Sequence, residues 1–198
     1  MNGYEKRTQD KRNQVLEATF YLMSGETGID DLTMEEIARN AKVGKTSIFK
    51  YFGSKENLIH QVFISFIDHI GTSAYEIMNK NMPFEETLIA LSQNKIDYMK
   101  KISKQFFLDL MDFYTSKQDD GLTLMMQQYT KESYNIMLDL FHRGRKEGKV
   151  DLKYSDEFLM IYFQALVEGI SNPYIYQRIL PYTAQWSELL IKSLAPGK

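Results

Sequence analysis

Hydrophobic residues recur at three- and four-residue steps along most of the 198-residue chain, which is the spacing of helices with one buried face. The first predicted helix begins near Thr8 and ends before Gly25. A long helix begins after Ser54 and continues to about Asn79, and Pro83 interrupts the pattern beyond it. The sequence shows no strand-type alternation, so we expect an all-α fold. The other helices are expected at 33–41, 45–52, 84–102, 104–116, 120–147, from 155 to near 173, and at 182–194.

The two short helices at 33–41 and 45–52 are separated by a tight turn that contains Gly44. Two short helices joined in this way predict a helix-turn-helix. The first of them starts with Thr33 and Glu36 in the arrangement of a capping box, in which each side chain binds the backbone N–H of the other residue. We therefore divide the chain into an N-terminal three-helix domain, residues 1–53, and a larger helical domain, residues 54–198.

The chain carries a net charge of −2, but its basic residues are unevenly placed. The segment from Ile37 to Lys55 contains five basic residues and no acidic one. A local basic surface on a nearly neutral protein is typical of a face that touches a polyanion. The basic residues of this segment are Arg39, Lys42, Lys45, Lys50 and Lys55.

The run Gly44-Lys45-Thr46 also resembles the end of a phosphate-binding P-loop, but its context excludes a nucleotide site. A P-loop needs a glycine five positions before the Gly-Lys pair, where this chain has Arg39, and it follows a buried strand rather than a helix. The three histidines do not cluster in the sequence, and no group of residues resembles a catalytic site. We therefore expect no metal, no cofactor and no enzymatic activity.

The N-terminal residues are polar, and no apolar run approaches the roughly 18 residues that a membrane helix needs. The chain has no cysteine, which fits a reducing compartment. We expect a cytoplasmic protein with no signal peptide and no membrane association.

The outer face of the second short helix offers small polar and basic side chains, namely those of Lys45, Thr46, Ser47 and Lys50. Lysine can reach the O6 and N7 atoms of guanine, and serine and threonine can meet several bases. The pattern therefore predicts a recognition helix for the major groove of DNA. Lys55 and the free N–H groups at the start of the next helix suit a DNA phosphate.

The segment LTMEEIARNAKVGKTSIFKYFGSKENLIHQVF resembles the N-terminal signature of the tetracycline-repressor (TetR) family of transcriptional regulators. That signature runs Thr-x-x-x-Ile-Ala, a turn, Leu-Tyr-x-Tyr-Phe and Lys-Glu-x-Leu, and the resemblance covers about residues 8–66. The chain departs from it at Phe49, where the family has a tyrosine that touches phosphate, and at Gly44 and Thr46, which replace the common serine and glycine. The matching residues are Thr33, Ile37, Ala38, Ile48, Tyr51, Phe52, Lys55, Glu56 and Leu58.

The resemblance implies a homodimer on palindromic double-stranded DNA, with a small-molecule pocket and the dimer contacts in the C-terminal helical domain. The family's DNA-contacting positions, matched to this sequence, and the basic residues of the same segment together give the predicted DNA contacts. These are Thr33, Lys42, Gly44, Lys45, Thr46, Ser47, Phe49, Lys50, Tyr51 and Lys55. Bulky apolar residues at helical spacing are the candidates for the pocket: Met78, Phe106, Phe107, Met111, Met125, Tyr129, Met137 and Tyr162. The candidates for the dimer interface are Phe158, Ala165, Gly169, Trp186 and Leu190.

These features favour a homodimeric transcriptional repressor that a small, largely apolar effector releases from its operator. Two alternatives stay open at this point. One is a DNA-binding regulator without a small-molecule effector, which acts through a protein partner or by occupancy alone. The other is a helical-bundle enzyme or carrier whose basic segment is incidental.

Overall fold

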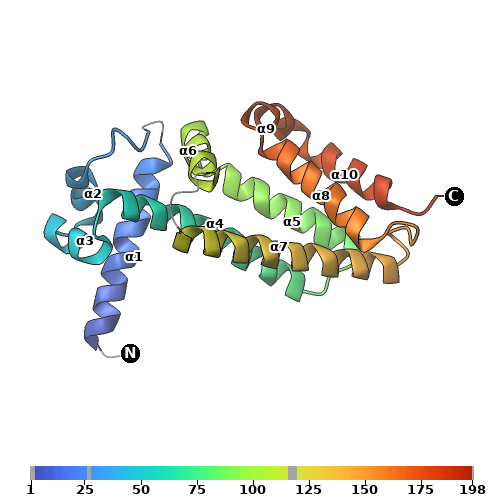
Figure 1. Cartoon of the computed structure of the whole chain (residues 1–198), viewed down its shortest axis with the longest axis horizontal. Coiled ribbons are helices and arrows are strands. Elements are labelled where there is room, and N and C mark those ends of the chain that lie inside the picture. Colours follow the sequence, from blue (N-terminus) through green and yellow to red (C-terminus); the bar gives the residue numbers. More distant parts are fainter. Residues whose placement is uncertain (1–2, 26–27, 116–119, 198) are drawn as a thin grey trace. The chain divides into compact units, whose positions relative to one another are not determined.

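The computed structural model describes residues 3–25, 28–115 and 120–197, without the side chains of 114–130, 170, 171, 173, 176, 177 and 180. Helices account for the regular structure throughout these residues, which confirms the all-α prediction (Figure 1). The elements are α1 (Gly3–Met23), α2 (Met34–Ala41), α3 (Lys45–Phe52), α4 (Lys55–Asn79), α5 (Phe84–Met99), α6 (Lys104–Thr115), α7 (Asp120–Lys146), α8 (Asp156–Ser171), α9 (Pro173–Ile179), the 3-10 helix η1 (Leu180–Tyr182) and α10 (Thr183–Leu194).

The chain folds into two compact units, and the boundary between them falls inside α4. The N-terminal unit comprises residues 1–68 and 100–116, and the C-terminal unit comprises 69–99 and 117–198. The predicted functional division between residues 53 and 54 is a different kind of boundary, and it stays a prediction.

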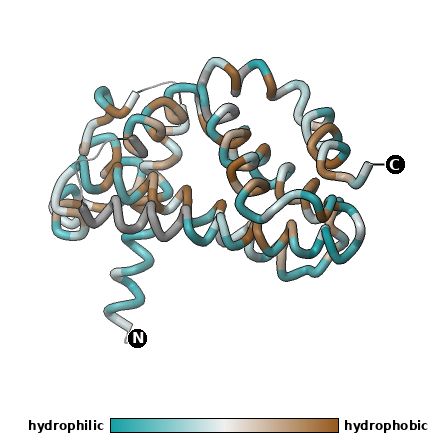
Figure 2. The backbone as a smooth tube through the Cα atoms, turned by 45° about the vertical axis from the view of Figure 1, so that its right-hand side comes forward, coloured by the Kyte–Doolittle hydropathy of each residue, from teal (hydrophilic) through white to brown (hydrophobic). Residues whose placement is uncertain are grey.

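The N-terminal unit has an aromatic core in which α6 joins α1 and α4. Phe106 is fully buried, and its ring centroid lies 5.5 Å from that of Phe20, 5.3 Å from that of Phe63 and 5.3 Å from that of Phe66. Edge-to-face contacts of this kind stabilise a core beyond the area they bury. The first turns of α1 are hydrophilic (Figure 2), and the residues from Gly3 to Arg7 are exposed.

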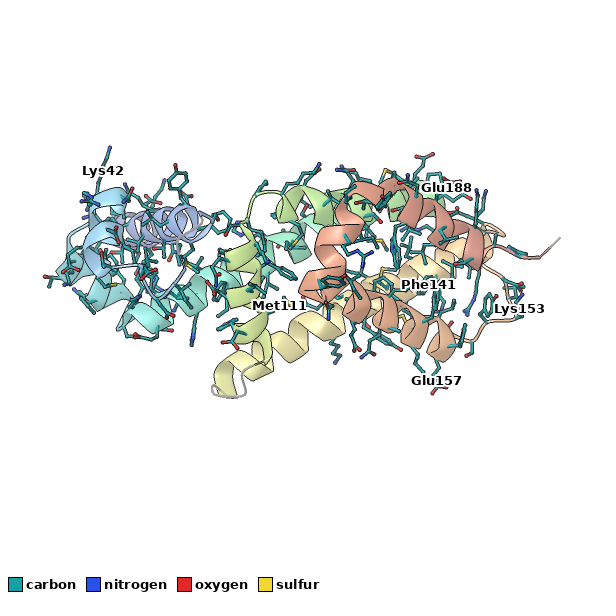
Figure 3. The ribbon with its side chains drawn as sticks, turned by 90° about the horizontal axis from the view of Figure 1, so that it is seen from above. Lys42, Met111, Phe141, Lys153, Glu157 and Glu188 are labelled. Carbon is teal, nitrogen blue, oxygen red and sulfur yellow. The ribbon has the colours of Figure 1, made fainter. Side chains whose placement is uncertain are left out.

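The C-terminal unit is built around a core shared by α5, α7, α8 and α10. Phe84, Leu140, Phe141 and Leu159 lie at its centre with 0–2% of their surface exposed. Figure 3 shows Phe141 among these helices, while the side chains of Glu157 and Glu188 point outward. Gly144 lies within α7, and Phe84 and Val150 pack against the position of its missing side chain.

Two differences from the sequence analysis concern the ends of helices. The helix predicted at 84–102 ends at Met99, and the segment after Ser171 forms α9 and η1 before α10 begins at Thr183. Proline is favoured in the first turn of a helix, so Pro173 starts α9 rather than leaving a loop. None of the helices in the described ranges is long and apolar enough to cross a membrane.

Candidate nucleic-acid interface

The capping box that starts α2 is present as predicted. The hydroxyl of Thr33 accepts a hydrogen bond from the Glu36 backbone N–H at 3.2 Å, and the Glu36 carboxylate accepts one from the Thr33 N–H at 3.1 Å. The Thr33 hydroxyl also donates to the same carboxylate at 2.9 Å. These bonds satisfy two backbone donors at the start of the helix, and they lower the pKa of Glu36.

In the turn between α2 and α3, the residue with a left-handed backbone conformation is Lys42 and not Gly44. Lys42 has the left-handed angles φ 53° and ψ 33°, and its N–H closes α2 by donating to Arg39. Gly44 instead has φ −59° and ψ 137°, which any residue adopts, and it forms the N-cap of α3 without a capping side chain. Figure 3 shows the Lys42 side chain extending away from the helices into solvent.

Helix α3 has one buried and one exposed face. Ile48 and Phe52, four residues apart, are 0% and 2% exposed and fix the helix on the core of the N-terminal unit. The opposite face presents Lys45, Thr46, Phe49 and Lys50, all exposed, with Ser47 half-buried beside them. The exposed face of α3 therefore carries cationic, hydroxyl and aromatic side chains that a ligand can contact together.

Glu35 of α2 reaches across to the recognition face and forms an ion pair with Lys45 of α3. Both side chains are exposed, and the hydrogen bond from Lys45 holds the pKa of the Glu35 carboxyl below its usual range. Lys45 also lies over the Phe49 ring at 5.9 Å. The segment from Ile37 to Lys55 contains no acidic residue, but Glu35, just before it, pairs with one of the lysines of this face.

Two basic residues near α3 are held by the protein itself. The Lys55 ammonium donates to the backbone carbonyl of Asp30 at 3.2 Å, and its side chain is half-buried. Arg12 of α1 donates to the Tyr51 carbonyl at 2.9 Å and lies over the Phe52 ring at 4.9 Å. Arg12 thus ties α1 to the end of α3, and Tyr51 itself is half-buried.

The substitution Gly44→Ser is expected to stabilise the protein by about 0.5–1 kcal/mol, because serine supplies a capping hydroxyl and reduces the freedom of the unfolded chain. A Cβ at this position meets no atom within 4 Å. Chemical denaturation of both proteins measures the gain. Gly44→Ala is the matched control, since it adds the Cβ without the hydroxyl. Equal stabilisation by alanine would show that capping plays no part.

The substitution Glu35→Gln is expected to raise the affinity for DNA roughly three- to tenfold at low salt, because it removes a negative charge and releases Lys45. Fluorescence anisotropy with labelled duplex DNA measures the change. Glu188→Gln is the matched control, since it breaks a similar exposed lysine pair in α10, with Lys192, and changes the net charge equally. An unchanged or lower affinity of Glu35→Gln would place Lys45 away from DNA.

The predicted pocket residues are distributed over both units. Phe106 and Phe107 are buried in the N-terminal unit, where Phe106 belongs to the aromatic core, and Met111 is half-buried on α6. In the C-terminal unit, Met78 and Met137 are buried in the core, and Tyr162 packs against it. Met125 and Tyr129 lie in α7, but their side chains are outside the described part.

The C-terminal unit contains a cavity of about 170 Å³ between α5, α7, α8, α9 and α10. Met137 is the predicted pocket residue among its lining, and two predicted interface residues, Trp186 and Leu190, also line it. Its remaining wall residues escaped the sequence analysis: Leu88, Leu91, Ser92, Lys95, Ile96, Met99, Phe163, Leu166, Val167, Ile179, Thr183 and Ser187.

The outer faces of α8 and α10 form an exposed apolar stripe in the C-terminal unit. Phe158 and Ile161 of α8 are 50% and 59% exposed, and Leu189 of α10 is 63% exposed. The two helices lie side by side in Figure 1, and the hydroxyls of Tyr162 and Ser193 meet at 3.3 Å. The predicted interface residues Ala165 and Gly169 share the helical spacing of this face, and a Cβ on Gly169 meets no atom within 4 Å.

The N-terminal part of the chain is similar in sequence to known transcriptional regulators. The family model described as bacterial regulatory proteins, tetR family, matches residues 15–62, which include α2 and α3. The uncharacterized HTH-type transcriptional regulator YhgD of Bacillus subtilis (strain 168) is 30% identical over 79 residues, which cover 40% of this chain and 41% of that protein. YuxN of the same organism, also described as an uncharacterized HTH-type transcriptional regulator, is 24% identical over 186 residues, which cover 91% of this chain and 60% of that protein. The chain therefore spans about half the length of these two relatives.

The fold is shared with solved regulators. The transcriptional regulator FadR from Bacillus subtilis, crystallised in complex with stearoyl-CoA, aligns with a TM-score of 0.66 and 15% identity over 90% of this chain and 96% of that one. The short helices α2 and α3, joined by a tight turn and packed on α1, form a helix-turn-helix in which α3 has an exposed polar face. Residues 15–62 are thus similar to the DNA-binding domain of bacterial regulatory proteins of the tetR family, and the helix-turn-helix of α2 and α3 lies within this match.

Proposed function

We propose that this protein is a homodimeric repressor that binds a palindromic operator through α3 and leaves it when a small molecule occupies the C-terminal cavity. The exposed face of α3 carries the proposal, since Lys45, Thr46 and Lys50 point away from a helix whose other face is buried. Lysine and threonine on a recognition helix read base edges and phosphates in a major groove. Lys42 adds a further exposed cation before the helix.

The apolar stripe supports a dimer. Single exposed hydrophobic residues are common on protein surfaces, but several of them on two adjacent helices suit an interaction site. A twofold dimer uses the same patch on both protomers, which suits a stripe made of one chain's own helices. Two copies of α3 would then address two half-sites about 34–36 Å apart, one turn of DNA.

The cavity supports control by an effector. It lies between helices and has a mostly apolar wall with a few polar groups, as small-molecule sites do. FadR, which shares the fold, was crystallised with stearoyl-CoA, so this architecture accommodates a ligand. Effector and DNA affinities would be coupled reciprocally, and a tenfold release needs only about 1.4 kcal/mol of differential binding.

Selection from a random-sequence DNA pool tests the operator part of the proposal. A palindromic consensus is the expected result, and enrichment of a sequence without symmetry would contradict a dimer that reads two half-sites. A compound library screened for operator release tests the effector part. If no compound altered operator binding, the protein would be a regulator without a small-molecule effector, which is the alternative that the sequence left open.

A further inference from the structure

Lys95 is the charged residue among the described side chains that line the C-terminal cavity. It lies on α5, on the same face as Leu88, Leu91 and Met99, where a buried helix face would ordinarily carry apolar residues. The other polar side chains of the wall are neutral, namely the hydroxyls of Ser92, Thr183 and Ser187 and the indole N–H of Trp186. A lysine among mostly apolar wall residues departs from the pattern of this helix face, which makes it a candidate functional group.

Among the described wall residues, no acidic side chain accompanies Lys95. Burial lowers the pKa of Lys95, and no carboxylate in the described part of the chain contributes to that shift. By its accessible surface the Lys95 side chain is exposed, as expected of a side chain that borders an open cavity rather than packed atoms. Its ammonium therefore borders a mostly apolar wall, and a ligand that enters the cavity can reach it.

The cavity also limits the size and charge of what it can hold. A volume of about 170 Å³ is close to that of an engineered protein cavity of about 150 Å³ that binds benzene, so one ring or a short branched chain fits. One lysine balances one negative charge. A phosphate, with nearly two charges, usually has several donors or a bidentate arginine, and the described wall residues include no arginine.

We propose that the cavity binds a small organic carboxylate with an apolar, ring-sized body, and that Lys95 forms an ion pair with the carboxylate. The proposal rests on the proposed effector-controlled function and names the chemical class of the effector. Leu88, Leu91, Met137 and Trp186 enclose the apolar body. An ion pair inside a mostly apolar wall is stronger than one in water, so the carboxylate adds affinity that a neutral molecule of the same shape lacks.

The test compares benzoate with benzamide, which have nearly the same shape and differ in charge. Trp186 is the single tryptophan of the chain and lines the cavity, so its fluorescence reports binding directly in the full-length protein. The wild-type protein is expected to bind benzoate at least about tenfold more tightly than benzamide. Lys95→Met is expected to abolish that preference, and Lys95→Arg is expected to retain most of it.

Lys192→Met is the matched control, since it removes an exposed lysine of α10 and should leave the preference unchanged. A thermal melt guards against misfolding. Each variant should melt in a single transition near the temperature of the wild type, so that a change in ligand preference reflects the site and not the fold.

The outcomes separate this proposal from the one on which it rests. An equal benzoate-to-benzamide ratio in wild type and Lys95→Met would overturn the role of Lys95. If neutral compounds released the operator and carboxylates did not bind, the carboxylate proposal would fail while effector control stood. If no compound of either kind bound the protein or released the operator, both proposals would fail.

Discussion

The double variant Ile161→Glu with Leu189→Glu is expected to be a monomer and to bind a palindromic operator at least about 100-fold more weakly than the wild type. Both residues are more than half exposed on the apolar stripe of α8 and α10. In a twofold dimer the substitutions would bring four carboxylates into one apolar interface, where their desolvation and repulsion oppose association. Without the dimer, each half-site binds alone and the gain from linking two recognition helices is lost.

Sedimentation velocity and operator titration measure the two effects in the same preparation. Leu152→Glu is the matched control, because Leu152 is 77% exposed and lies in the turn before α8 rather than on the stripe. It should leave the dimer and the operator affinity unchanged. A double variant that remained dimeric would place the dimer interface elsewhere on the molecule.

The substitution Gly144→Ala is expected to destabilise the protein by about 1–3 kcal/mol, although alanine is ordinarily the better helix former. A Cβ on Gly144 would lie 2.6 Å from Val150 Cγ2 and 2.7 Å from Phe84 Cδ2. Phe84 and Val150 are 0% and 1% exposed, so neither side chain can move aside without disturbing the core. Urea denaturation monitored by circular dichroism measures the loss.

Two further variants make the explanation for Gly144 testable. Gly169→Ala places the same methyl group on a helical glycine where no atom lies within 4 Å, and it should not destabilise the protein. Phe84→Leu should be destabilising alone, but it makes room beside Gly144. The double variant Gly144→Ala with Phe84→Leu should therefore lose less stability than the sum of the two single losses. Additive losses would mean that the two sites do not clash.

The helix-turn-helix could be predicted from the sequence because its signals are local. The capping box of Thr33 and Glu36 spans four residues, and the spacing of Ile48 and Phe52 marks the buried face of α3. The contact between Glu35 and Lys45 joins residues ten positions apart in different helices, and it depends on the angle at the turn. The turn itself contains Lys42 in a left-handed conformation, which the sequence did not indicate.

The cavity could not be predicted in the same way, because its wall comes from five helices whose packing the spacing within one helix does not define. Apolar spacing identified Met137 as a wall residue, but it placed Phe106 in the same pocket, whereas Phe106 fills the N-terminal core. Lys95 had a signal in the sequence, namely a cation on the apolar face of a helix that runs from Phe84 to Met99. Only the cavity beside it gives that cation a functional interpretation.

Hydroxyl-radical footprinting on the selected palindrome tests the central claim most directly, namely that a dimer reads DNA through α3. The expected result is two protected patches related by symmetry, with centres about 34–36 Å apart, that disappear as salt rises. Lys50→Ala should weaken both patches together, because each protomer contributes one exposed α3. A single patch without symmetry, or no protection at low salt, would contradict the claim.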